Sequence, residues 1–176
     1  ILIALSALVF STSLLANKIG VIYDSGGKFD KSFNELAFRT AERVQNELGW
    51  DMLEFEAANN TQIEQGMRKV ADRGATLIVA MGFAQADAVA AIAPQYPDIN
   101  FVAVDVCWVD DPAGNIYQAC YLEHEGSFLV GMIAAMASKS GTIGFVGGMD
   151  IPLIRKFQGG YEQGALHVNP NIEILA

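Results

Sequence analysis

The sequence predicts an α/β fold in which helices cover both faces of a parallel β-sheet. Short β-rich runs alternate with amphipathic helical stretches along most of the chain. The strand-like runs are continuously apolar, for example residues 18–23 (KIGVIY) and 76–81 (TLIVAM). Strands of that kind are typical of a parallel sheet that is buried on both sides.

Residues 18–106 contain four predicted strands and three predicted helices. Gly49 ends the first helix and Pro94 stops the third, because neither residue continues a helix well. Ser32 and Glu35 have the spacing of a capping box at the start of the first helix. The apolar residues expected on one face of that helix are Phe33, Leu36, Ala37, Ala41, Val44 and Leu48. The strands are expected at 18–23, 51–56, 76–81 and 100–106, and the helices at 32–48, from 61 onward and at 85–93.

The remainder of the chain begins with a fifth predicted strand, reached through a loop at 108–115. A long apolar helix follows it, and the alternation of strand and helix then starts again. The expected elements are strands at 116–122, 142–146 and 172–176, and helices at 125–138 and 152–168.

Composition and charge exclude several classes of protein. The chain has 176 residues, of which 52% are hydrophobic, so intrinsic disorder is excluded. Its net charge is −9, from 11 basic and 20 acidic residues. Nucleic acids and anionic membrane surfaces attract clustered Lys and Arg, so neither is an expected partner.

The chain opens on an uncharged apolar run at residues 1–16 (ILIALSALVFSTSLLA). This run is shorter than the roughly 20 residues of a transmembrane helix. It fits the end of a truncated secretory signal peptide, and the alternative is a buried core segment. A lipoprotein signal requires Cys at the next position, which is Asn17. We therefore expect an exported, soluble, periplasmic protein without a lipid anchor.

The two cysteines, Cys107 and Cys120, lie in strand-like segments on either side of one loop. They form no CxxC motif and have no His at zinc-site spacing. Export permits a disulfide between them. Two buried, unpaired thiols remain the alternative.

Polar and small residues gather where the predicted strands end. In an open parallel sheet, ligands bind outside the carboxyl ends of the strands. That edge is expected to carry Asp24 after the first strand, Met81 and Gly82 at the third, and Asp105 near the end of the fourth. The glycines after Asp24 match no phosphate-binding motif, and Asp24 and Asp30 would repel a phosphate.

Phe33 and Asn34 follow this turn on the first helix and complete a set suited to a neutral polar molecule. A Phe ring stacks on flat heterocycles, an Asn amide both donates and accepts, and a carboxylate accepts from two hydroxyls. The alternative assigns Phe33 to the core, Asn34 to the helix start and Asp105 to a turn.

Catalysis has little support in the sequence. The two histidines, His124 and His167, lie near no GxSxG elbow and are expected at the surface. No metal-ligand constellation stands out, and no cofactor is predicted. We expect a binding protein without catalytic residues, not an enzyme.

Residues 24–34 (DSGGKFDKSFN) resemble the signature of the basic membrane protein family of ABC-transporter substrate-binding proteins, which includes purine nucleoside receptors. The resemblance continues through Gly82, Asp105, residues 144–148 (GFVGG) and residues 151–154 (IPLI), and it spans almost all of 18–170. It implies a type I periplasmic-binding-protein fold with two lobes. Residues 17–140 would form the complete first lobe, and residues 141–176 the start of a truncated second lobe.

The family resemblance also implies site residues and partners. Phe33 would stack on the base of a nucleoside, Asn34 and Asp24 would bond its polar groups, and Asp105 would bond the ribose. The protein would be a monomer that delivers its ligand to membrane permease subunits. A relative that binds a flavin or a sugar-like signal, and a ligand sensor without a transport role, remain alternatives.

Overall fold

The computed structural model describes residues 17–176, so the predicted signal peptide at 1–16 lies outside the described residues. The chain forms two compact units, of which the first ends at Cys120 and the second spans Tyr121–Ala176. Each unit has its own sheet, and each is described separately below.

The first unit is built on a five-stranded sheet in which every neighbouring pair is parallel. Its strand order is β2-β1-β3-β4-β5, which confirms the predicted parallel α/β architecture. The strands are β1 (Lys18–Tyr23), β2 (Asp51–Glu56), β3 (Leu77–Met81), β4 (Asn100–Val104) and β5 (Ile116–Ala119). The helices are α1 (Phe33–Leu48), α2 (Ile63–Asp72) and α3 (Ala86–Ile92), with short 3₁₀ turns at Asn60–Gln62, Phe83–Gln85 and Ala93–Gln95.

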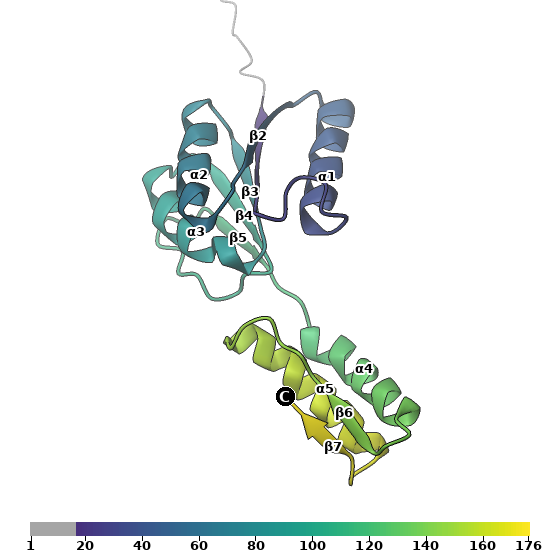
Figure 1. Ribbon diagram of the computed structural model, residues 1–176. Helices are drawn as coiled ribbons and strands as arrows, with labels where there is room; N and C mark the ends of the chain where they lie inside the picture. Colours follow the sequence, from purple (N-terminus) through teal and green to yellow (C-terminus); the bar gives the residue numbers. More distant parts are fainter. Residues whose placement is uncertain (1–16) are drawn as a thin grey trace, which may run out of the picture. The chain divides into compact units, whose positions relative to one another are not determined.

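Helices cover both faces of this sheet, with α1 on one side and α2 and α3 on the other (Figure 1). Because side chains alternate along a strand, Val21 and Tyr23 pack with α1 while Ile22 packs with the opposite core. All three side chains are at most 1% exposed. The inner strand β1 is therefore buried from both sides, as its continuous apolar sequence predicts.

The buried face of α1 differs from the predicted one. Asn34, Ala37 and Ala41 are buried, whereas Phe33 is 42% exposed and Leu36 is 61% exposed. Leu48, also expected on the buried face, is exposed as well. Successive helical residues are about 100° apart, so a stripe through 34, 37 and 41 turns 33 and 36 away from the sheet. The interpretation of Phe33 as a core residue is therefore wrong.

The start of α1 also differs from the prediction. Ser32 occupies the N-cap position but makes no side-chain capping bond, so the expected capping box is absent. Asp30 replaces it: its Oδ1 accepts hydrogen bonds from the Ser32 and Glu35 amides at 2.7 and 3.1 Å, and its Oδ2 accepts from the Asn34 amide at 3.2 Å. The Asp30 carboxylate, two residues before the N-cap, thus accepts the hydrogen bonds that the free amides of the first helical turn require.

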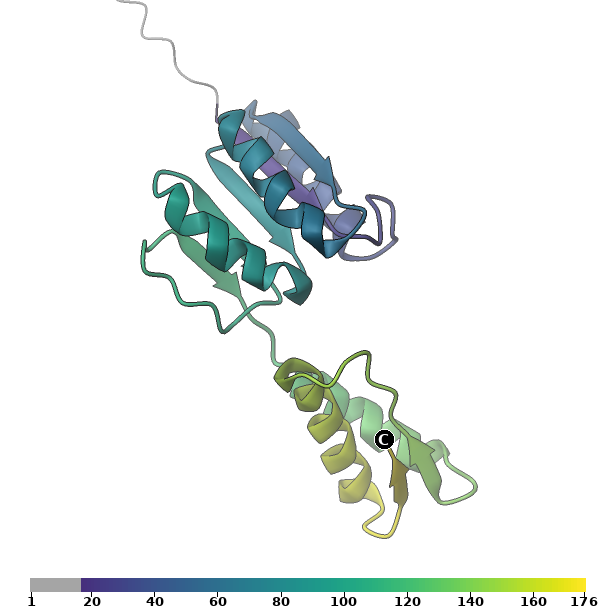
Figure 2. The ribbon, with the colours of Figure 1, turned by 60° about the vertical axis from the view of Figure 1, so that its left-hand side comes forward.

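The second unit contains two helices, α4 (Glu123–Ala137) and α5 (Pro152–Val168), and two strands. The strands β6 (Thr142–Gly144) and β7 (Glu173–Leu175) form a parallel pair. Figure 2 shows α4 and α5 running alongside each other next to this pair. Three glycines allow the two helices to approach until their backbones touch.

A Cβ atom added at Gly131 would lie 1.9 Å from the Tyr161 carbonyl oxygen, and one at Gly164 would lie 1.9 Å from the Phe128 carbonyl oxygen. At Gly160 the distance to the His124 carbonyl oxygen would be 2.3 Å. Any side chain at these positions forces the helices apart. The contact between α4 and α5 thus depends on glycine.

This packing places the boundary between the units earlier than the predicted lobe boundary at residue 140. The unit boundary follows Cys120, so α4 belongs with α5 and not with the first sheet. The physical reason is the close contact between α4 and α5 that their glycines allow. The two helices are separated in the sequence, so the sequence alone does not reveal this contact. Strand β5 also ends at Ala119, before the predicted residue 122.

Cys107 and Cys120 form a disulfide, with their Cα atoms 5.6 Å apart. This settles the alternative that the sequence leaves open. Cys107 follows β4 and Cys120 follows β5, and these strands are neighbours in the sheet. The bond therefore ties the carboxyl ends of two adjacent strands together.

Candidate functional site

The first sheet has a topological switch point at β1. From this strand the chain goes to β2 on one side and later to β3 on the other. In doubly wound sheets of this order, ligands bind outside the carboxyl ends of the strands at such a point. Asp24 follows β1, Met81 ends β3, and Asp105 follows β4, so the fold brings these predicted residues to one edge.

The strand register places three of the predicted residues at the same level. Ile22 pairs with Ala80, so two residues further on Asp24 is level with Gly82. Met81 pairs with Val104, so Asp105 is level with Gly82 as well. Adjacent strands are about 4.8 Å apart, which puts the Asp24 and Asp105 backbones on the order of 10 Å from each other, a span that suits a small molecule.

The backbone is unusual at this edge. Gly82 has φ 88° and Asp105 has φ 64°. A positive φ is uncommon for a residue with a side chain, and such residues cluster at functional sites. Hydrogen bonds hold both positions: the Gly82 amide donates to the Val104 carbonyl at 3.1 Å, and the Asp105 amide donates to the Ala119 carbonyl at 2.9 Å.

The carboxylate of Asp24 is held within its own turn. Its Oδ1 accepts hydrogen bonds from the Gly26 amide at 2.8 Å and from the Asn34 side-chain amide at 2.7 Å. Asn34 also donates to the Gly27 carbonyl at 3.1 Å, and its Oδ1 accepts from the Asp24 amide at 3.4 Å. The turn and the first turn of α1 are therefore one hydrogen-bonded body.

These contacts change the role assigned to Asn34. Its side chain is fully buried, and both hydrogens of its amide are committed to Asp24 and Gly27. The sequence predicts that Asn34 contacts the ligand directly, but its side-chain amide contacts Asp24 and Gly27 instead. In this structure Asn34 positions the Asp24 carboxylate.

Met81 is likewise less open than the sequence predicts. Its side chain is 7% exposed and packs with the core on the α1 side of the sheet. Met81 therefore belongs to the core next to this edge of the sheet, and the neighbouring Gly82 lies at the surface of the edge.

Asp30 holds the segment that leads into Phe33. Burial opposes its ionisation, but the amides of Ser32, Glu35 and Asn34 outweigh this effect and lower the pKa of Asp30. The Asp30 carboxylate therefore stays charged at neutral pH and continues to accept hydrogen bonds from the start of α1. Phe33 stands in the helical turn that these bonds fix, with its ring 42% exposed.

Sequence reasoning missed an ion-pair network beside the site. Lys28 Nζ lies 2.6 Å from Glu54 Oε1, and the Tyr23 hydroxyl donates to the same oxygen at 2.7 Å. Burial, and after it the hydrogen bond to Glu54, raises the pKa of Tyr23. Tyr23 and Glu54 lie on neighbouring strands, so only the strand pairing, and no sequence spacing, could have connected them.

Other chemistry was sought among the described residues. Residues 17–176 contain no group of His, Cys, Asp and Glu side chains arranged to hold a metal ion. Within the same range, no helix combines the length and apolar character needed to cross a membrane. His124 and His167 are both exposed, as predicted.

Comparison with known families gives a match over residues 16–176 to the family described as "ABC transporter substrate-binding protein PnrA-like". This range includes the whole of both described units and all six predicted site residues.

Individual relatives agree with that match. The chain is 35% identical over 159 residues to "Basic membrane protein A" of Borreliella burgdorferi, covering 89% of this chain and 46% of the relative. It is 31% identical over 161 residues to "ABC transporter nucleoside-binding protein BmpA" of Lactococcus lactis, covering 89% of this chain and 45% of the relative. The chain thus spans about half the length of these relatives.

A solved structure shows the same fold. The solute-binding protein of an ABC transporter system from Aeropyrum pernix superposes with a TM-score of 0.77 at 29% identity, covering 90% of this chain and 46% of that one. The architecture is therefore that of type I periplasmic-binding-like solute-binding proteins, as the family resemblance implies. The chain belongs to the family of PnrA-like ABC transporter substrate-binding proteins.

Proposed function

We propose that this protein binds a purine nucleoside at the carboxyl edge of β1, β3 and β4 and delivers it to the permease of an ABC importer. One observation carries the proposal. The exposed ring of Phe33 stands on the same hydrogen-bonded body as the fixed Asp24 carboxylate, and Asp24 is level with Asp105 across the sheet edge. The nucleoside-binding name of the Lactococcus lactis relative supports it.

Each residue has a part in this proposal. Phe33 stacks on the base, Asp24 accepts hydrogen bonds from polar groups of the ligand, and Asp105 accepts from the ribose hydroxyls. Gly82 has no side chain, so the ligand can approach the backbone between the two carboxylates. Those carboxylates disfavour a phosphate, and the proposal is therefore a nucleoside and not a nucleotide.

Transport in this proposal depends on closure of two lobes around the ligand. In our proposal the ligand contacts both lobes, and these contacts shift the population toward a closed form that the permease recognises. The protein is exported to the periplasm, acts as a monomer and catalyses no reaction. The permease subunits are its membrane partners.

Isothermal titration calorimetry of the complete gene product tests the proposal. The ligands are adenosine, guanosine and inosine, with riboflavin and glucose for the alternative ligand classes. Saturable binding of at least one purine nucleoside, tighter than that of riboflavin or glucose, is the expected result. Binding of riboflavin or glucose with no response to any nucleoside would overturn the proposal.

Phe33→Ala is expected to weaken nucleoside binding by roughly 1–3 kcal/mol, or about 5- to 150-fold, because base–aromatic stacking contributes that much. Its effect on stability should stay well below the roughly 3–5 kcal/mol that a buried Phe contributes, since the ring is 42% exposed. Calorimetry and thermal unfolding measure the two effects. Leu36→Ala, one turn along and 61% exposed, is the matched control. Unchanged affinity in Phe33→Ala would remove the stacking role.

Asp105 is expected to make the protein prefer adenosine over 2′-deoxyadenosine. A hydrogen bond to a charged group contributes about 1.5–3 kcal/mol, so the preference should be roughly 10- to 150-fold. Asp105→Asn keeps the shape but lacks the charged acceptor, and it should reduce the preference. Asp87→Asn, at an exposed position of α3, is the control. Equal affinity of the parent protein for both nucleosides contradicts the ribose role.

A further inference from the structure

The segment between β1 and α1 carries no regular secondary structure of its own, yet it sets the position of Asp24 and Phe33. The bonds of Asp24, Asp30 and Asn34 hold it to itself and to the start of α1. They do not tie it to the neighbouring strand β2. The contacts that do so come from Lys28.

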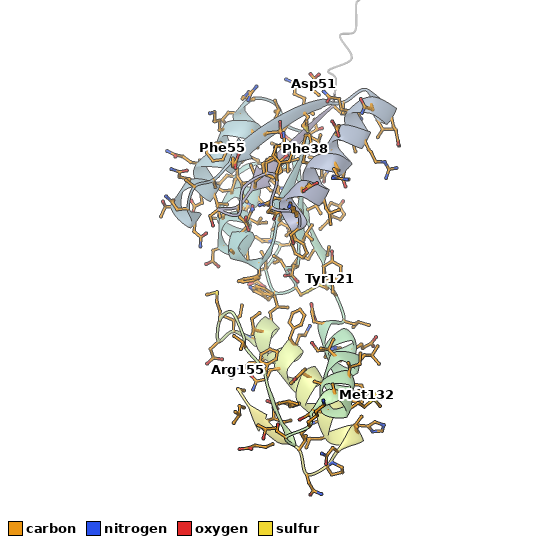
Figure 3. All side chains as sticks on the ribbon, turned by 45° about the vertical axis from the view of Figure 1, so that its right-hand side comes forward. Phe38, Asp51, Phe55, Tyr121, Met132 and Arg155 are labelled. Atoms are coloured by element: carbon orange, nitrogen blue, oxygen red, sulfur yellow. A yellow bond between two sulfur atoms is a disulfide. The ribbon has the colours of Figure 1, made fainter. Side chains whose placement is uncertain are left out.

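Lys28 reaches two different elements. Its Nζ lies 2.6 Å from Glu54 Oε1 on β2 and 3.7 Å from the centre of the Phe38 ring on α1. Its backbone amide donates to Glu56 Oε1, also on β2, at 3.3 Å. Figure 3 labels Phe38, which packs with the core between α1 and the sheet.

Glu54 is itself fixed by the strand from which the segment departs. The buried Tyr23 hydroxyl donates to Glu54 Oε1 at 2.7 Å. Tyr23 is the last residue of β1, directly before Asp24. Glu54 therefore contacts both Tyr23 and Lys28. Through it, the middle of the segment is connected to the end of β1, where the segment begins.

Electrostatics makes the lysine charge important here. Asp24 and Asp30 lie in the segment, and Glu54 and Glu56 lie on the strand beside it. The Lys28 and Glu54 side chains are only 22% and 32% exposed, so water screens the pair less than it screens surface pairs. Loss of the Lys28 charge leaves these carboxylates to repel one another.

We propose that Lys28 is a positioning residue that holds the Asp24–Phe33 segment in its binding-competent form without touching the ligand. The expected effect of Lys28 on nucleoside affinity rests on the proposed function. Its expected effect on the order of the segment rests on the structure alone. Apparent affinity falls in proportion to the competent fraction. If Lys28→Met lowers that fraction to about a tenth, nucleoside affinity falls about tenfold.

Two measurements on the complete gene product test the proposal. The first is amide hydrogen exchange at residues 24–35 without ligand, and the second is adenosine affinity by calorimetry. Lys28→Met should weaken binding about tenfold, and exchange in this segment should approach that of an unprotected chain, because about nine tenths of the molecules would then have the segment open. Lys28→Arg, which keeps the charge, should restore both. Lys69→Met removes another lysine that lies over an aromatic ring, 5.5 Å from Phe55, and should change neither.

Glu54→Gln gives an independent route to the same contact. If the ion pair is responsible, Lys28→Met should have little further effect in the Glu54→Gln background. Exchange and affinity that Lys28→Met leaves unchanged would overturn the proposal, and so would equal losses in Lys28→Met and Lys28→Arg. If the parent protein binds no nucleoside, the proposed function fails, while the exchange measurement still decides the role of Lys28.

Discussion

Gly164→Ala is expected to destabilise the second unit by about 3 kcal/mol, at the upper end of the cost of overpacking. The new Cβ would lie 1.9 Å from the Phe128 carbonyl oxygen and 2.7 Å from its carbonyl carbon. Both atoms belong to the α4 backbone, which cannot turn aside as a flexible side chain can. The two helices must separate, and the packing between them is lost. Amide exchange in α4 and α5 measures the effect.

Gly159→Ala is the matched control for this substitution. Gly159 lies on the same helix, but a Cβ there meets nothing within 4 Å. Because Ala favours a helix by about 1 kcal/mol over Gly, Gly159→Ala should stabilise α5 slightly. Equal effects of the two substitutions would show that helix propensity, and not close helix contact, determines the result.

Replacement of both cysteines by serine is expected to lower the free energy of unfolding of the first unit by about 3 kcal/mol. Cys107 and Cys120 are 13 residues apart, and closing a loop of that size in the unfolded chain contributes roughly this amount. The double variant avoids an unpaired thiol. Chemical denaturation of the oxidised parent protein and of the variant measures the difference.

A reductant provides the control for the disulfide. Dithiothreitol should lower the stability of the parent protein toward that of the Cys107→Ser/Cys120→Ser variant, and it should leave the variant unchanged. A parent protein whose denaturation midpoint does not respond to the reductant would contradict the contribution assigned to the bond.

Much of the fold of the first unit could be predicted from sequence, because its strands are continuously apolar and its helices amphipathic. Residues 18–23 and 51–56 were predicted as strands and form β1 and β2 with the same bounds. Periodicity was less reliable for α1. Its buried stripe runs through the polar Asn34, which a hydrophobic pattern does not select.

The boundary between the units could not be predicted, because it depends on contacts between glycines of one helix and backbone carbonyls of the other. Gly131 and Gly164 read as weak helix formers in the sequence. Only the packing of α4 on α5 shows that each makes room for a carbonyl group of the other helix. Helix α4 consequently belongs to the second unit, although the sequence assigned it to the first lobe.

The candidate site was predicted in part. The rule for parallel sheets placed Asp24, Gly82 and Asp105 at one edge, and the strand register brings them to one level. The separate roles of Asn34 and Lys28 depend on hydrogen bonds and an ion pair that no spacing reveals. Sequence therefore predicted which residues gather at the edge, but not which of them hold the others in place.

Amide hydrogen exchange of the complete gene product, with and without adenosine, tests the central claim most directly. If the ligand binds at the switch point of the first sheet, adenosine should slow exchange in three separate segments, at residues 24–35, 81–84 and 104–107. These segments lie at the carboxyl ends of β1, β3 and β4 and are separate in the sequence, so protection that is stronger in all three than in the rest of the sheet is the pattern expected of a ligand at this edge. Saturating adenosine that binds but leaves the three segments unprotected would contradict the proposed site.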